Sequence, residues 1–159
     1  MGTSHIVAAL DFLQHTTNVL LIRDPVDMLP SLVNQLETPS LRDTGFKKLV
    51  DLQEHLIGLG QTPQVLDSRE LLKDPPGVLQ ELCSQLDVPF ESTMLNWTAG
   101  ARPEDGIWAK YWYHSVHKST TFQPYKPKLD PFPERLRSLR NTCQTYYDRL
   151  FLNAIKASA

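Results

Sequence analysis

The distribution of apolar and polar residues predicts alternating helices and short strands in the first half of the chain. Apolar residues at helical spacing predict a helix over 6–14, and a continuous apolar run follows at 18–22. This run is rich in branched residues and bounded by polar groups, which is typical of a strand buried on both faces in a parallel sheet. A second short strand is predicted at 64–67, directly after Pro63.

Three helices are predicted around these strands. Asp24 and Pro25 suit the N-cap and first position of a helix, and Pro30 should kink or restart that helix. Its inner side would carry Met28, Leu29, Leu32, Val33 and Leu36. The second helix is expected at about 43–58. Its inward residues would be Phe46, Leu49, Val50, Leu56 and Ile57. The third helix opens at Asp74-Pro75 and ends at Pro89.

The order of these elements predicts an α/β fold with a partial parallel sheet flanked by helices. Because sheets usually have about four to six strands, two predicted strands indicate that N-terminal strands of the sheet are missing. We expect residues 1–159 to form a single, incomplete domain, with an aromatic and proline-rich loop region at 90–132. Short helical turns are expected in that region at about 92–96 and 108–115. A final helix is predicted over 133–156, with Ile155 on its apolar side.

Composition and charge narrow the classes of function. The apolar fraction of 41% and the charged fraction of 21% are ordinary for a globular protein. A net charge of −2 gives no electrostatic sign of nucleic acid or of an anionic membrane as a partner. No apolar run approaches the roughly 20 residues of a membrane span, and no signal peptide is recognised. Cys83 and Cys143 are expected to be thiols in the core, which favours a cytoplasmic location.

The feature that points to chemistry is the arginine at the end of the first predicted strand. Ligands of open α/β sheets bind at the carboxyl ends of the strands, and an arginine fork suits a phosphate. Ser31 follows Arg23 by eight residues and lies in the next predicted helix. The alternatives are that Arg23 pairs with a carboxylate such as Asp27, and that Ser31 is a hydroxyl on a helix surface.

The spacing of Arg23 and Ser31 resembles the 3′-phosphate-binding segment of the P-loop sulfotransferases. In that family a strand ends in a three-residue motif of Arg, then either Asn or Asp, then Pro. A Ser follows eight positions after the Arg. Residues 65–82 resemble the later strand, Asp-Pro and helix of the family. Residues 99–122 resemble the aromatic loop of a sulfotransferase-like subgroup sometimes found joined to aminotransferase-like domains. The resemblance implies a P-loop NTPase-like sulfotransferase fold that binds PAPS as co-substrate and a small-molecule acceptor, without a metal.

The same resemblance implies three further parts of the site. The first is a glycine-rich phosphate loop for the 5′-phosphosulfate, which is not found among the seven glycines of this sequence. The second is a histidine base on an upstream segment. The third is a basic loop at the 3′-phosphate, for which Arg102 is the candidate and Lys110 and Lys118 are weaker ones. The chain is therefore expected to be a sulfotransferase. The alternative is a catalytically inactive binding or regulatory module, or a truncated product. Self-association through an open sheet edge is also expected.

The catalytic base is left unassigned. The available histidines are His5, His15, His55, His114 and His117. His114 and His117 have a spacing compatible with metal ligands, but no matching Cys or carboxylate completes a site, and no metal is expected. Trp108, Trp112 and Tyr113 would line an acceptor pocket, stack on adenine, or form a local aromatic core that holds the loop.

Overall fold

The computed structural model describes residues 11–107, 109–127 and 130–158, and its center is a three-stranded parallel sheet. The strands are β1 (Val19–Ile22), β2 (Gln64–Asp67) and β3 (Ala154–Ile155), in the order β1-β2-β3. β1 and β2 run in register from Val19 beside Gln64 to Ile22 beside Asp67. The predicted α/β class with a parallel sheet is confirmed.

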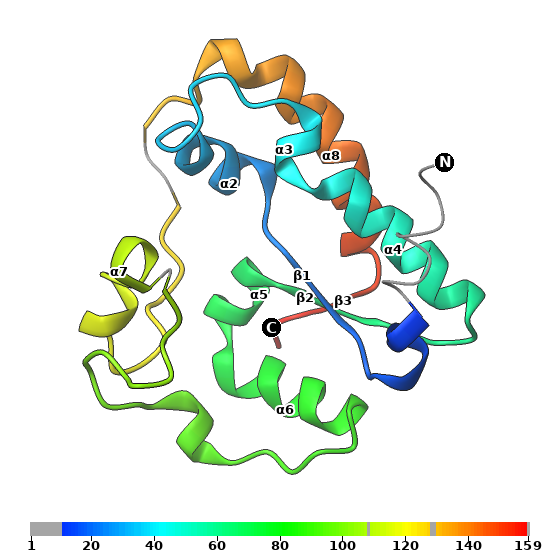
Figure 1. Cartoon of the computed structure of the whole chain (residues 1–159), viewed down its shortest axis with the longest axis vertical. Helices are drawn as coiled ribbons and strands as arrows, with labels where there is room; N and C mark the ends of the chain where they lie inside the picture. Colours follow the sequence, from blue (N-terminus) through cyan, green and yellow to red (C-terminus); the bar gives the residue numbers. More distant parts are fainter. Residues whose placement is uncertain (1–10, 108, 128–129, 159) are drawn as a thin grey trace.

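The helices lie on both sides of this sheet (Figure 1). Those that connect the strands are α2 (Pro25–Leu32), α3 (Leu41–Thr44), α4 (Phe46–Gly58), α5 (Ser68–Lys73) and α6 (Pro75–Gln85). The helix before β3 is α8 (Arg137–Phe151). α4 and α8 pack together on one side of the sheet, whereas α6 lies on the other side.

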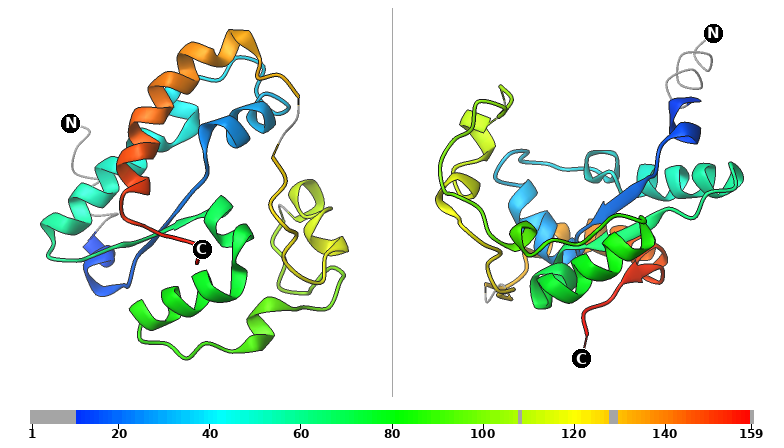
Figure 2. Two further views of the ribbon diagram at one scale, coloured as in Figure 1. Left: turned by 180° about the vertical axis from the view of Figure 1, so that it is seen from behind. Right: turned by 90° about the horizontal axis from the view of Figure 1, so that it is seen from below.

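The second half of the chain contains the loop region. Its short helical turns are η2 (Ser92–Leu95), α7 (Ala109–Trp112), η3 (Val116–Lys118) and η4 (Glu134–Leu136). Seen from behind and from below, the segment around α7 stands to one side of the sheet, on the side of α2 and α5 (Figure 2). The predicted turn at 92–96 is confirmed as η2.

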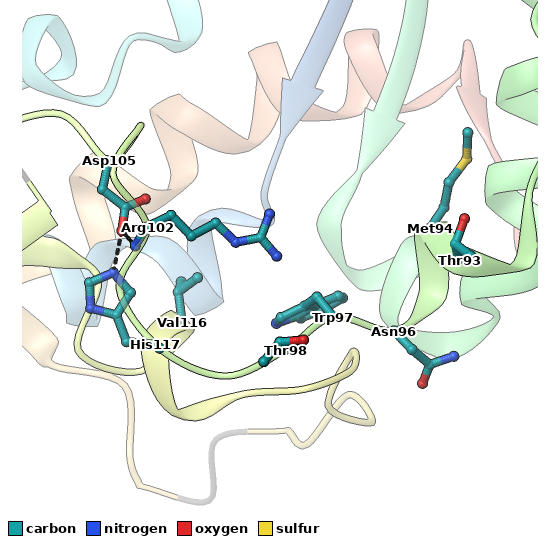
Figure 3. A pocket seen from close by; sticks show the side chains of 10 residues that line it. Thr93, Met94, Asn96, Trp97, Thr98, Arg102, Asp105, Val116 and His117 are labelled. Carbon is teal, nitrogen blue, oxygen red and sulfur yellow. Dashed lines mark hydrogen bonds and ion pairs between the residues drawn. The ribbon is translucent and has the colours of Figure 1, made fainter.

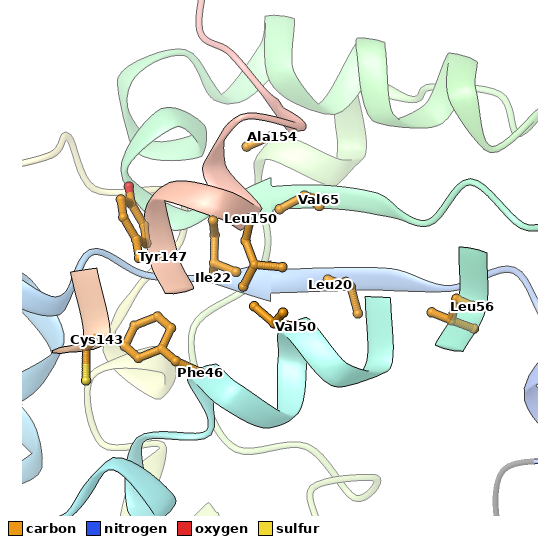
Figure 4. Packing of buried hydrophobic residues seen from close by; sticks show 10 residues of the cluster. All are labelled: Leu20, Ile22, Phe46, Val50, Leu56, Val65, Cys143, Tyr147, Leu150 and Ala154. Atoms are coloured by element: carbon orange, nitrogen blue, oxygen red, sulfur yellow. The ribbon is translucent and has the colours of Figure 1, made fainter. Parts of the chain in front are cut away.

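The core lies between the sheet and the helix pair α4 and α8 (Figure 4). Every second residue of β1 points into it, so that Leu20 and Ile22 are buried while Val19 and Leu21 are exposed. Phe46 and Tyr147 pack edge to face, with ring centroids 6.4 Å apart. Cys83 and Cys143 are buried free thiols, as predicted. None of the helices in the described ranges has the length and apolar character of a membrane span.

The C-terminal prediction was wrong in its last part. The helix ends at Phe151, and Ala154 and Ile155 form β3 beside β2. The sheet therefore gains a strand from the end of the chain. Ile155 is buried in the strand, and a helix would also have placed this apolar residue on its inner side. The sequence pattern therefore did not distinguish a strand from a helix at this position.

Several helix boundaries also differ from the predictions. Gly45, with a φ of +75°, separates α3 from α4, where one continuous helix was expected. α2 ends at Leu32, so Leu36 lies beyond the helix and is exposed. Ile57 is also exposed, in the last turn of α4. The 6–14 helix lies mainly outside the described residues, whose first element is η1 (Asp11–His15).

Candidate functional site

Arg23 lies where the chain leaves the sheet after β1. Because Ile22 is beside Asp67, the residues that follow β1 and β2 emerge together at the carboxyl edge of the sheet. They line a cavity of about 590 Å³, whose polar residues include Arg23, Ser68, Arg69, Ser115, Tyr125 and Lys126. The site thus combines the ends of two strands with the loop region.

Arg69 is the structural link between the two strand ends. One of its terminal nitrogens, Nη2, lies 2.7 Å from Oδ2 of Asp24 and 3.1 Å from Oδ2 of Asp27. Partial burial lowers the pKa of Arg69, but the two carboxylates outweigh this and raise it above its usual value. Arg69 therefore stays charged, and its single positive charge is outweighed by the carboxylates of Asp24, at the N-cap of α2, and Asp27, within α2.

Tyr125 joins the loop region to this ion pair. Its hydroxyl donates to Oδ2 of Asp27 at 3.2 Å, and the Arg69 guanidinium lies 5.2 Å from the center of its ring. Burial and the neighboring carboxylates raise the pKa of Tyr125, so it remains a hydrogen-bond donor at neutral pH. Nε of Arg69 is buried and has no hydrogen-bond partner in the described part of the chain.

The arrangement leaves Arg23 available for a ligand. Asp27, considered above as its partner, is bound by Arg69 and Tyr125 instead. Across residues 11–107, 109–127 and 130–158, the exposed side chains of Arg23 and Lys126 form no ion pair or hydrogen bond. Asp24 and Asp27 carry two negative charges against the one positive charge of Arg69, so Arg23 and Lys126 turn the group of five charged side chains net positive.

The start of α2 is formed as predicted from the sequence. Oδ1 of Asp24 accepts from the backbone N–H of Val26 at 2.8 Å, and Pro25 occupies the first helical position. Pro30 is accommodated inside α2, which ends two residues later. Asp24 therefore both caps the helix and anchors it to Arg69, which fixes the backbone next to Arg23.

Ser31 and Arg102 lie apart from the Arg23 cavity. The Ser31 hydroxyl, half-buried on α2, donates to the Asp27 carbonyl oxygen one turn earlier at 3.4 Å. Arg102 lines a second cavity of about 620 Å³, together with Trp97, Asp105 and His117 (Figure 3). Val116 lines both cavities, so they are neighbors.

The other candidates have separate surroundings. Nε2 of His117 lies 2.8 Å from Oδ2 of Asp105, and Tyr113 packs edge to face on the imidazole. The exposed His114 has no such pair, and the described residues contain no cluster of metal-ligating side chains. Lys110 lies over Tyr111, and Lys118 is exposed. His5 and Trp108 lie outside the described residues. The predicted grouping of Trp108 with Trp112 and Tyr113 is therefore left untested.

Arg69, Tyr125 and Lys126 were missed by the sequence reasoning. A signal for Arg69 was present, because it follows β2 by two residues and the position of Arg23 after β1 had already drawn attention to the carboxyl edge. No comparable signal exists for Tyr125 and Lys126. The loop brings them to the site from about a hundred residues farther along the chain.

Comparison with known proteins identifies related sequences. The family model described as "Sulfotransferase domain" matches residues 3–157. Branched-chain-amino-acid aminotransferase-like protein 1 of Arabidopsis thaliana is 43% identical over 114 residues, which are 72% of this chain and 20% of that protein. The similarly named protein 2 of the same plant is 37% identical over 131 residues, which are 82% of this chain and 23% of that protein. The chain thus spans about a fifth of the length of these curated relatives, and no solved structure matches it.

Proposed function

The chain belongs to the sulfotransferase domain family, and on that premise we propose that it binds the sulfate donor PAPS for sulfuryl transfer to a small acceptor. The observation that carries the proposal is the position of Arg23. Its exposed guanidinium stands at the carboxyl end of β1, in a cavity at the strand ends, without a described protein partner. We assign it to the 3′-phosphate of the donor.

The balance of charge supports an anionic ligand at Arg23. Arg69 is more than compensated by two carboxylates, but Arg23 and Lys126 form no described ion pair and make the net charge of the five side chains positive. Ser68 and Ser115 line the same cavity and bring hydroxyl groups that donate to phosphate oxygens. A phosphate accepts several charge-assisted hydrogen bonds, which suits such a mixture of guanidinium, ammonium and hydroxyl groups.

Ser31 and Arg102 enter the proposal as additional phosphate ligands, with less support than Arg23. For Ser31, the hydroxyl must turn from the Asp27 carbonyl toward the Arg23 cavity, which Ser31 does not line. For Arg102, the side chain must reach beyond the second cavity that it lines. Both residues are therefore expected to contribute less to donor binding than Arg23.

The proposed role of these residues in sulfuryl transfer is positioning. An acceptor atom attacks sulfur in line and PAP leaves, so holding the donor in place and balancing its charge are the tasks of the protein. We assign no catalytic base. A second candidate function is a sulfotransferase-like binding or regulatory module without turnover, because the residues assigned in this proposal account only for the 3′-phosphate side of a donor site.

We also propose that the chain self-associates through the outer edge of its sheet, at β1.

A cytoplasmic location stays a prediction, and it rests on the two buried thiols that form no disulfide. The aminotransferase-like names belong to the relatives. The matched region is about a fifth of the length of those proteins.

Calorimetric titration with PAP tests the donor assignment. Arg23→Ala should weaken PAP binding by about tenfold or more, because a charge-assisted hydrogen-bond pair to the phosphate is lost. The matched control is Arg42→Ala, which removes an exposed arginine on α3, away from the cavity. AMP, which lacks the 3′-phosphate, should bind wild type and Arg23→Ala equally.

Two results would contradict the assignment: PAP binding that Arg23→Ala leaves unchanged, or an equal loss in Arg42→Ala. Turnover is measured separately, as release of PAP from PAPS with a panel of small acceptors. Binding of PAP without any turnover would favor the non-catalytic module over the enzyme.

A further inference from the structure

The second cavity is an open hollow bordered by two limbs of the loop region. The limbs are joined by the bridge between Asn96 and Thr121 and by a hydrogen bond from the Trp97 N–H to the Thr120 carbonyl at 2.9 Å. Gly100, with a φ of +124°, donates to the carbonyl of His117 at 2.8 Å. These cross-links form a defined wall around the cavity of about 620 Å³.

A flat aromatic surface forms one side of the cavity. The Trp97 indole donates through Nε1 to Oγ of Ser119 at 3.1 Å. Its ring also packs edge to face on Phe122, with centroids 5.3 Å apart. Because both contacts fix the indole plane before any ligand arrives, a flat ligand can stack on it at little cost in side-chain entropy.

Arg102 supplies a cation to the same cavity. Asp105, an acid of the same loop, is already occupied, since its Oδ2 accepts from the Arg102 backbone N–H at 2.9 Å and lies 2.8 Å from Nε2 of His117. The side chain of Arg102 points away from this pair, on the side of Trp97 (Figure 3). Across residues 11–107, 109–127 and 130–158 the guanidinium has no ion-pair or hydrogen-bond partner.

We infer that the second cavity binds a small, flat carboxylate, with the carboxylate on Arg102 and the flat body on Trp97. The guanidinium offers a planar fork that matches a carboxylate, and the indole offers a matching face. Thr93, Asn96 and Thr98 add polar groups to the lining, which suits a ligand with a hydroxyl or similar substituent. Arg23 and Arg69 do not line this cavity. In this inference Arg102 serves the carboxylate in place of the donor phosphate.

The neighborhood of the two cavities suggests the role of the ligand. Val116 lines both, Ser115 faces the Arg23 cavity and His117 faces the second one. A carboxylate bound there lies next to the donor cavity and is the acceptor, an assignment that rests on the proposed function. The binding site itself stands without PAPS, so the two proposals can fail separately.

A matched pair of probes tests the site. 4-Hydroxybenzoate and its neutral isostere 4-hydroxybenzamide are titrated into the wild-type chain by calorimetry, without PAP. The carboxylate should bind about tenfold or more tightly than the amide, and Arg102→Gln should remove that preference. Trp97→Leu should weaken both probes alike. Lys118→Gln, which removes a nearby exposed charge that does not line the cavity, is the control and should bind as wild type does.

NMR locates the binding, since the Trp97 indole N–H and the Gly100 amide should shift with the carboxylate probe. The inference is overturned if wild type binds neither probe, if it binds both equally, or if the preference survives in Arg102→Gln. It is also overturned if Arg102→Gln weakens PAP as much as Arg23→Ala does, because Arg102 then serves the phosphate. Carboxylate binding without PAP binding would support this site and contradict the donor assignment.

Discussion

At the scale of the residue, Arg69 explains why Arg23 is available to a ligand. Asp24 and Asp27 are only 8% and 6% exposed, so their charges require a partner within the protein. Arg69 supplies it with one planar group that reaches both acids, and Tyr125 occupies the same Oδ2 of Asp27. The carboxylates beside Arg23 are therefore already bound.

Removing Arg69 should destabilise the fold because it leaves two nearly buried carboxylates without their cation. We expect Arg69→Ala to lower the free energy of unfolding by about 3 kcal/mol, the lower part of the range for breaking a buried pair. Arg69 is 27% exposed, so solvent reduces the effect. Arg69→Lys should fall between, because it keeps the positive charge but an ammonium cannot stack on the Tyr125 ring as the planar guanidinium does. Urea unfolding measures each value.

Arg149→Ala is the control for this experiment. It breaks an exposed pair with Glu54, in which the side chains are 54% and 52% exposed, and should cost about 0–1 kcal/mol. Equal effects of Arg69→Ala and Arg149→Ala would show that Arg69 does not hold the site together.

Residue-level prediction from sequence succeeded where the chemistry is local. The cap at Asp24 and the strand-end position of Arg23 depend on immediate neighbors and were foreseen. The pairing of Asp27 with Arg69 and Tyr125 joins residues 42 and 98 positions apart, and only the tertiary fold brings them together. The same holds for Ser31, whose hydroxyl was placed correctly along the chain but is directed to the backbone of its own helix.

At the scale of the element, Asp67 joins β2, α5 and α8. It is fully buried, and its Oδ1 accepts from the backbone N–H groups of Arg69 and Glu70 at 2.9 and 3.0 Å. The Tyr147 hydroxyl on α8 donates to Oδ2 at 3.1 Å. Burial nevertheless outweighs these hydrogen bonds and raises the pKa of Asp67 above its usual value.

This shift predicts a pH dependence of stability. Because the folded-state pKa of Asp67 is raised, its contribution to stability is fully present below its unfolded pKa of about 3.9. That contribution is lost as the pH rises through the folded-state value. Asp67→Asn cannot ionise, so its stability relative to wild type should increase from pH 4 upward. Urea unfolding of both proteins between pH 4 and 8 measures the difference.

Asp67→Ala separates charge from hydrogen bonding in this comparison. It removes the acceptor for two N–H groups at the start of α5 and for Tyr147, and relative to Asp67→Asn it should cost about 1–3 kcal/mol at every pH. A constant difference between wild type and Asp67→Asn across the pH range would refute the effect of the buried charge.

The predictability of elements followed their length. α4 and α6 have several turns of apolar spacing, and both were anticipated. The differences are the first residues of α4 and the end of α6, which comes at Gln85, before the predicted stop at Pro89. β3 has two residues, too few for a period, and its pairing with β2 is made across almost ninety positions. A strand of that kind is stabilised by the sheet it joins, which no local pattern encodes.

At the scale of the whole molecule, β1 forms one border of the sheet. β2 pairs with its inner side, and no described strand pairs with its outer side. Val19 and Leu21 are 39% and 62% exposed on the face turned away from α4 and α8. An edge strand with unpaired backbone groups and exposed apolar side chains is a favorable surface for pairing with a second copy.

We therefore expect wild type to dimerise with rising concentration and Leu21→Lys to shift that equilibrium toward monomer, because a lysine charge must be desolvated when two edges meet. Sedimentation velocity over a range of concentrations measures the shift. Leu152→Lys is the matched control, since Leu152 is 82% exposed beyond α8 and distant from the β1 border along the sheet order β1-β2-β3. A monomer at all concentrations, or equal effects of both lysines, would rule out association through β1.

The dimer contact and the Arg23 cavity should act independently, because the ligand site lies at the carboxyl ends of the strands and the contact lies along their side. Leu21→Lys should therefore dissociate the dimer and leave PAP binding unchanged.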